Sequence, residues 1–433
     1  MQIYEYPNRD QWRALLQRPV TAAEIAEDQV LQILVAVRNK GDAALREFSR
    51  KFDCVDVREL SVSEAEIAVA EANVSPKLKA AIRLAIDNIT KFHVPQLHSE
   101  AIIETSPGVR CWRRCVPIER VGLYVPGGTA PLFSTVLMLA IPAKIAGCRE
   151  IVLCSPPQKD SSLNPLILYT AKVTGVDRIF RVGGAQAIAA MAYGTESVPQ
   201  VDKIFGPGNS WVTLAKQLVS RAGVAIDMPA GPSEIAVVAD ASAKPEFVAI
   251  DLLSQAEHGA DSQVMLITNS LTVAQNVESN INELLPSLPR RDIAEQALAN
   301  SRAIVLGNPA EMIEFANAYA PEHLIIMTEN AVALSEKVTN AGSVFIGAFT
   351  PEAAGDYASG TNHTLPTYGY ARNMSGVSVD SFVKKITFQT LTENGLRGIG
   401  PAIECMATAE GLDAHGKAVS MRLAALTKGA ENE

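Results

Sequence analysis

The chain has 433 residues, a formal net charge of −9 at neutral pH and an isoelectric point near 5.4. Its length is roughly three times that of an ordinary domain, so we expect two large domains with smaller appendages. The acidic balance argues against nucleic acids and acidic membranes as partners, because a negative protein gains nothing from their phosphate charges. We therefore expect a small-molecule substrate.

Three further features predict a soluble, cytoplasmic protein. The first seven residues lack the basic and apolar regions of a secretory signal. The apolar run of residues 136–141 is far shorter than the ~20 residues that a membrane span needs. The six cysteines show neither zinc-ribbon nor redox spacing, so we expect reduced thiols, with Cys111, Cys115, Cys148 and Cys154 as buried structural residues.

The N-terminal ~95 residues predict helices over residues 22–38, 43–51 and 76–92, and they contain no chemical motif. From residue 121 the pattern changes to short β-branched runs that alternate with helical stretches. These runs predict strands over residues 121–125, 150–154, 178–182, 203–205, 235–239, 263–268, 304–306, 323–327 and 343–346. The tail, from about residue 394, predicts helix again.

Continuous apolar strands separated by helices are typical of parallel sheets that are covered on both faces. Nine strands of this kind are many for one sheet. The sequence therefore predicts an α/β fold with two open, mostly parallel, incomplete Rossmann-like domains and with helical N-terminal and C-terminal appendages.

Three glycine-rich turns follow predicted strands. They are Gly127-Gly128-Thr129, Gly183-Gly184-Ala185 and Gly206-Pro207-Gly208. Glycine lets a ligand approach the backbone, and the next helix N-terminus attracts a pyrophosphate. None completes Gly-x-Gly-x-x-Gly, since the last turn has Trp211 at the third position. One such turn is equally well a structural turn, but three predict an atypical nucleotide cleft edged by Tyr124, Gln186 and Asn209.

A candidate metal site begins at a predicted helix that ends near His258, with Gln255 three residues earlier on the same face. By itself this pair is better explained as a structural helix end. Asp356, in a predicted loop between two glycines, adds a carboxylate, and His363 or His415 would complete a set of nitrogen and oxygen ligands. That set suits zinc and would also hold manganese or cobalt, although glutamine is an unusual zinc ligand.

Glu322 and His323 precede the apolar run of residues 324–327. A carboxylate and an imidazole at the entrance of a strand are well placed for proton transfer, because histidine titrates near neutrality and glutamate can activate water. The alternative is an exposed polar pair after a turn that contains proline.

Two runs, IDMPAGPSE at residues 226–234 and DLLSQAEH at residues 251–258, closely resemble histidinol dehydrogenase, the family of the last two steps of histidine biosynthesis. The resemblance extends to loop 205–209, Pro321-Glu322-His323, loop 355–366 and Ala414-His415. It covers the chain from residue 121 to the C-terminus and shows no departure at a functional position.

The resemblance implies a role for each matching residue. The zinc ligands would be Gln255, His258, Asp356 and His415, all of them also close to the substrate together with His323. Glu322 and His323 would transfer protons. Ser233, His363 and Glu410 would border the substrate, and Tyr124, Gln186 and Asn209 would contact NAD. The family is a homodimer in which the C-terminal segment crosses to the partner, so His415 and Glu410 would serve the other chain's site.

With the resemblance, the predicted domains are an N-terminal helical segment over residues 1–20 and a catalytic, metal-binding α/β domain made of residues 21–120 and 235–377. Residues 121–234 would form the nucleotide-binding α/β domain, and residues 378–433 would form the dimerisation segment.

The implied reaction is the zinc-dependent oxidation of L-histidinol to L-histidine through bound L-histidinaldehyde, with two NAD reduced in succession. One alternative is a dehydrogenase on the same scaffold that oxidises another small alcohol. It is disfavoured because His363, Glu410 and His415 are all present. Another alternative is a zinc hydrolase that needs no cofactor, and the three glycine-rich turns argue against it.

Overall fold

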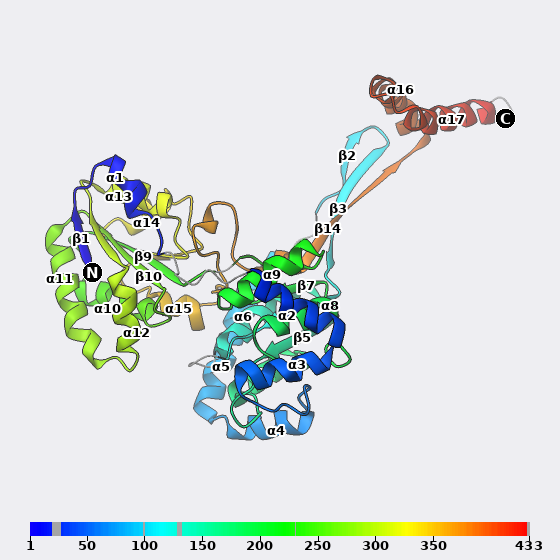
Figure 1. Cartoon of the computed structure of the whole chain (residues 1–433). Coiled ribbons are helices and arrows are strands. Elements are labelled where there is room, and N and C mark those ends of the chain that lie inside the picture. Colours follow the sequence, from blue (N-terminus) through cyan, green and yellow to red (C-terminus); the bar gives the residue numbers. More distant parts are fainter. Residues whose placement is uncertain (20–26, 98–99, 128–131, 230, 431–433) are drawn as a thin grey trace. The chain divides into compact units, whose positions relative to one another are not determined.

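The computed structural model describes residues 1–433 except 20–26, 98–99, 128–131, 230 and 431–433 (Figure 1). Gly128, Thr129 and Ala230 of the predicted motifs, and the start of the helix predicted over 22–38, lie outside the described residues. The chain divides into two compact units, Met1–Gln96 with Ile118–Phe382, and Leu97–Pro117 with Val383–Glu433. Within the described ranges, no helix is both long and apolar enough to cross a membrane.

The first unit contains a five-stranded parallel sheet in the order β6-β5-β4-β7-β8. Its strands are β4 (Arg120–Tyr124), β5 (Glu150–Ser155), β6 (Arg178–Arg181), β7 (Lys203–Phe205) and β8 (Ala225–Ile226). They alternate with α6 (Phe133–Ala146), α7 (Pro165–Thr174), α8 (Gly184–Tyr193) and α9 (Ser210–Arg221). The helices follow the strands one by one, which is why these strands are parallel.

The first unit also contains a six-stranded parallel sheet in the order β1-β11-β10-β9-β12-β13. Its strands are β1 (Gln2–Glu5), β9 (Glu234–Ala239), β10 (Gln263–Thr268), β11 (Arg302–Val305), β12 (His323–Met327) and β13 (Ser343–Ile346). The helices are α1 (Arg9–Leu15), α10 (Pro245–Ala256), α11 (Leu271–Leu284), α12 (Arg291–Ala299), α13 (Pro309–Tyr319), α14 (Ala331–Ser335) and α15 (Glu352–Tyr357). Apart from β1, its order matches that of the five-stranded sheet.

All nine predicted strands are confirmed within one or two residues, because most of their apolar runs are buried, although β13 at the edge of its sheet is only partly buried. The sequence analysis missed β1 in the segment that it predicted as helical. This short strand adds to the edge of the sheet by pairing with β11, and its mixed polar sequence gives little strand signal. It also missed the two-residue β8, which is too short to show a period.

The N-terminal helices are α2 (Glu27–Lys40), α3 (Asp42–Phe48), α4 (Glu64–Asn73) and α5 (Pro76–His93), with a π-helical turn, η1 (Ser49–Asp53), after α3. The sequence and its family resemblance predict that residues 21–120 belong to the same domain as the six-stranded sheet. In the structure, apolar side chains of α2 and α3 join the core of the five-stranded sheet, and α5 packs on α6. The difference arises because the sequence pattern of an amphipathic helix shows that one of its faces is buried, but does not show which sheet that face packs against.

The second unit is an antiparallel sheet, β14-β3-β2, followed by two helices. Its elements are β2 (Ile103–Ser106), β3 (Val109–Pro117), β14 (Val383–Leu391), α16 (Glu393–Ala409) and α17 (Asp413–Ala430). The helical tail is confirmed, whereas the sheet was not predicted, since few of its residues are buried and its strands carry many charges. Cys111 and Cys115 in β3 are only half-buried, contrary to prediction, while Cys148 and Cys154 are buried.

Candidate active site

Glu322 and His323 stand at the amino end of β12, next to the amino end of β9. Both side chains are buried and both are held by the backbone of Glu234. The Glu234 N–H donates to Oε2 of Glu322 over 2.9 Å, and the Glu234 carbonyl oxygen lies 3.2 Å from Nδ1 of His323. A carbonyl oxygen can only accept, so this contact puts a proton on Nδ1 and leaves Nε2 of the neutral ring as the basic nitrogen.

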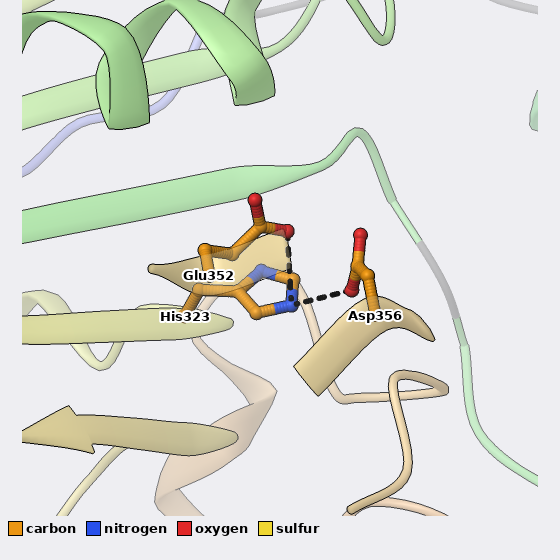
Figure 2. A group of neighbouring side chains, drawn as sticks. All are labelled: His323, Glu352 and Asp356. Carbon is orange, nitrogen blue, oxygen red and sulfur yellow. Dashed lines mark ion pairs between the residues drawn. The ribbon is translucent and has the colours of Figure 1, made fainter. Parts of the chain in front are cut away.

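Two carboxylates from α15 face Nε2 of His323 (Figure 2). Oε1 of Glu352 and Oδ1 of Asp356 each lie 3.7 Å from that nitrogen. The ligand atoms of His323, Glu352 and Asp356 all lie within 4.8 Å of one another, close enough to hold a metal ion. Oε1 of Glu352 is buried and has no hydrogen-bond partner among the described residues. The group is therefore a compact negative pocket around one imidazole.

Burial and mutual charge shift the pKa values of this group. Burial raises the pKa of Glu322 to about 8, and burial with the neighbouring Asp356 raises that of Glu352 to about 8. Burial by itself would lower the pKa of His323, but the surrounding carboxylates, first Glu322, outweigh it and raise that pKa to about 10. Burial also opposes the charge of Asp356, yet His323 and His363 hold its pKa far below its usual range. Asp356 is thus a fixed anion among groups that exchange protons.

The C-terminal end of α10 carries the other two predicted metal ligands of this unit. Gln255 is buried, and its Oε1 has no hydrogen-bond partner among the described residues. His258 lines a cavity of about 570 Å³. Burial lowers the pKa of His258, and the negative charge of Asp356 opposes this shift. A neutral imidazole, a carboxylate and an unsatisfied carbonyl oxygen are suitable donors for a cation.

A smaller cavity, of about 70 Å³, brings three predicted residues together: Ser233, Glu322 and His363. Nδ1 of His363 lies 3.0 Å from the carbonyl oxygen of Asp356, which puts a proton on that nitrogen. Its Nε2 lies 3.4 Å from Oγ1 of Thr135. Burial lowers the pKa of His363, so the ring is neutral. Ser233 also lines the larger cavity with His258, so it borders both spaces.

The three predicted nucleotide contacts line one cavity of about 640 Å³ at the carboxyl ends of β4, β6 and β7. The Tyr124 hydroxyl is buried and accepts from the Gly184 N–H over 3.1 Å. Gln186 is buried in α8, and Asn209 caps α9 by accepting from the Val212 N–H over 3.1 Å. Gly206 in the third turn has a φ of +120°, and a Cβ there would meet the Tyr124 carbonyl oxygen at 2.0 Å, so this turn needs glycine.

Glu410 and His415 belong to the second unit. Glu410 ends α16, His415 lies in the first turn of α17, and both side chains are exposed. Their roles at the metal and the substrate stay predictions.

Two residues of the site were missed. Glu352 stands four residues before Asp356, a spacing that puts both carboxylates on one helical face. The sequence analysis took Asp356 as part of a loop, which was wrong: α15 is only 6 residues long, and the glycine inside it suggested a turn. Glu234 acts through its backbone at a strand start, which has no signal in the sequence.

Residues 16–423 match the family model described as histidinol dehydrogenase. A histidinol dehydrogenase of Bacteroides thetaiotaomicron is 59% identical over 423 residues, covering 98% of this chain and 99% of the relative. One from Bacteroides fragilis is 58% identical over 428 residues, 99% of this chain and 100% of the relative. The crystal structure of histidinol dehydrogenase from Elizabethkingia anophelis superimposes with a TM-score of 0.97 at 55% identity, covering 99% of each chain.

Proposed function

This chain belongs to the histidinol dehydrogenase family, and we propose that the site around His323 oxidises L-histidinol to L-histidine with zinc and two molecules of NAD. The observation that carries the proposal is the buried pair of Glu322 and His323, fixed by one backbone residue beside donors for a cation. The family's place is in the final steps of histidine biosynthesis, so the substrate is a small molecule.

His323 is proposed as the base of both oxidations. Nε2 would take the proton of the substrate hydroxyl, while Nδ1 stays bound to the Glu234 carbonyl oxygen. NAD, when bound, would supply the hydride acceptor for the carbinol carbon. A cation held by Asp356 would neutralise one of the charges that raise the pKa of His323. The pKa of the imidazole would then lie closer to neutrality, where a general base is most effective.

Glu322 is proposed to hydrate the aldehyde between the two oxidations. Its carboxyl borders the small cavity, and burial raises its pKa to about 8, so it exchanges a proton near neutral pH. Glu322 would remove a proton from water as the water oxygen attacks the aldehyde carbon, and protonated His323 would return its proton to the carbonyl oxygen. The product is a gem-diol, a second alcohol that the neutral His323 can deprotonate. The enclosed cavity also keeps the aldehyde away from other nucleophiles.

The proposed zinc ligands in this unit are Gln255, His258 and Asp356, with His415 from a partner subunit as the fourth. The unsatisfied Oε1 of Gln255 supports this set, because a buried carbonyl oxygen without a donor is satisfied by a cation. When bound, zinc would hold the imidazole and amine of the substrate and orient its carbinol carbon. Ser233, His363 and Glu410 would complete the substrate pocket.

Tyr124, Gln186 and Asn209 are proposed to contact NAD in the 640 Å³ cavity. The N-termini of α8 and α9 begin beside these residues and attract the pyrophosphate. We also propose that the enzyme is a cytoplasmic homodimer in which residues 378–433 complete the partner's site.

The test is to count the NADH formed for each L-histidinol consumed by the purified protein, with and without a zinc chelator. Two NADH, lost on chelation and recovered with zinc, are expected. One NADH would mean that the second oxidation fails. No NADH would point to another small alcohol or, if an amide or ester is cleaved, to the zinc hydrolase.

A further inference from the structure

Asp53 is a carboxylate in the nucleotide cavity that the proposed mechanism does not use. It is the last residue of the π-helical turn η1, and Cys54 after it has a φ of +59°. Such turns are uncommon and occur often at functional sites. The side chain lines the 640 Å³ cavity together with Tyr124, Gln186 and Asn209. The chain thus bends sharply where it presents a charge to this cavity.

The Asp53 carboxylate has an unsatisfied acceptor. Its Oδ2 atom is buried and has no hydrogen-bond partner among the described residues. Burial raises the pKa of Asp53 to about 6, and a hydrogen bond with the Ser49 side chain opposes this only in part, so the carboxyl is an anion at neutral pH that is incompletely compensated. Buried acceptors in native proteins are almost always satisfied, which points to a donor supplied by whatever fills the cavity.

Only some parts of a dinucleotide can supply that donor. The phosphates carry acceptors and negative charge, so a carboxylate repels them. The two hydroxyls of a ribose are neighbouring donors that match the two oxygens of one carboxylate. Ile33, Phe52 and Trp211 line the same cavity and offer apolar surface for a base, and the Phe52 ring is 48% exposed. The helix N-termini at Gly184 and Ser210 suit the pyrophosphate instead.

We propose that Asp53 accepts hydrogen bonds from both hydroxyls of the adenosine ribose of NAD and thereby excludes NADP, whose 2′-phosphate would meet this carboxylate. Asp53 is then a specificity-determining residue of the cofactor site. The inference rests on the proposed function in one respect, namely that a dinucleotide occupies this cavity.

The experiment measures the dissociation constants of NAD, NADP and nicotinamide hypoxanthine dinucleotide by calorimetry, for the wild-type enzyme and Asp53→Asn. The wild type should bind NAD at least ~100-fold more tightly than NADP, because like charges repel in a partly buried site. The Asp53→Asn substitution should raise the dissociation constant of NAD about 10-fold, the usual effect of losing hydrogen bonds to a charged group. It should also lower the ratio of the NADP dissociation constant to the NAD dissociation constant by a similar factor.

The matched control is Asp56→Asn. Asp56 lies three residues further along, is exposed and pairs with Arg50 at 3.4 Å outside the cavity. The Asp56→Asn variant should bind all three dinucleotides with the same affinity as the wild type. Asp53→Ser, a smaller substitution, serves as a second variant if Asp53→Asn does not fold, and thermal unfolding reports which variants are native.

Two results would overturn the proposal. The first is that both Asp53 variants bind NAD and NADP with the same dissociation constants as the wild type, which would show that the carboxylate does not bind the ribose hydroxyls. The second result is that the wild type binds the hypoxanthine analogue more weakly than NAD, while Asp53→Asn binds the analogue no more weakly than the wild type does. That result would show that the carboxylate binds the adenine amino group instead of the ribose. Binding is measured without turnover, so a protein that binds NAD but does not oxidise histidinol contradicts the proposed function and leaves the ribose contact supported.

Discussion

The two parallel sheets of the first unit share a strand order but place their functional residues at opposite edges. In the five-stranded sheet, the cofactor cavity lies at the carboxyl ends of β4, β6 and β7. In the six-stranded sheet, Glu322 and His323 lie at the amino end of β12, beside the amino end of β9. Open α/β sheets ordinarily bind ligands beyond their carboxyl ends, so only the first sheet follows the rule.

The difference follows from the polarity of the helices. At the carboxyl ends of the strands of the five-stranded sheet, here called the carboxyl edge, loops lead into the N-termini of α8 and α9. The partial positive charge of a helix N-terminus suits an anionic cofactor. At the amino ends of the strands of the six-stranded sheet, here called the amino edge, α10 ends at Ala256, between Gln255 and His258. The partial negative charge of a helix C-terminus suits a cation. The same strand order thus supports both proposed sites, one for an anionic cofactor and one for a cation.

The strongest test at the amino edge is His323→Asn. Loss of the base should lower kcat on both histidinol and histidinaldehyde by about 10³-fold, within the range of general-base catalysis. Steady-state NADH formation with each substrate measures this. Glu322→Gln is the matched comparison and should slow the aldehyde step selectively. Near-normal turnover in His323→Asn would remove His323 as the base, and equal losses in Glu322→Gln would contradict its role in hydration.

A second test asks whether the amino edge is completed by another chain. His258→Ala and His415→Ala should each be inactive, and mixing them should restore about a quarter of the wild-type activity. The reason is that half of randomly mixed dimers are heterodimers, each with one intact site. Activity is assayed after demonstrated subunit exchange. No recovery would mean that each site is built within one chain.

A third test concerns the support of the amino edge. Arg18 Nη2 donates to Oε2 of Glu234 over 2.9 Å in a largely buried ion pair, and Glu234 carries the backbone that holds Glu322 and His323. Arg18→Met should cost about 3 kcal/mol of unfolding free energy, because it leaves a buried charge unpaired. Chemical denaturation measures it. The control is Arg9→Met, which breaks an exposed pair with Glu314 and should leave stability nearly unchanged.

The smallest expected effect is at the carboxyl edge and depends on pH. Burial raises the pKa of Asp53 to about 6 from an unfolded value of 3.8, so the folded state binds protons more strongly between these values. The contribution of this carboxyl group to the free energy of unfolding is therefore fully present below pH 3.8 and is lost as the pH rises through about 6. Without NAD, Asp53→Asn should be more stable than the wild type at pH 7.5, by about 1 kcal/mol, because solvent screens a partly exposed carboxylate and reduces the effect of its pKa shift. Thermal unfolding from pH 4 to 7.5 checks this, and a constant difference across that range would contradict it.

Much of the site could be read from its residues. The motifs around Gln255, His258, Glu322 and His323 resemble a known family, and the structure brings Glu322, His323, Asp356 and His363 together. Glu352 could have been found from its spacing to Asp356, had that segment been predicted as helix. Glu234 and Asp53 could not, since their roles depend on which strand start and which cavity they reach.

The sequence by itself determined the nine buried strands, their parallel arrangement and the family, because apolar periodicity and short motifs are local properties. The tertiary structure alone decided that α2 and α3 cover the five-stranded sheet, that β1 and the antiparallel strands of the second unit exist, and that the two ligand sites lie at opposite sheet edges. These features depend on contacts between residues far apart in the chain, and burial against a distant partner leaves no period in the local sequence.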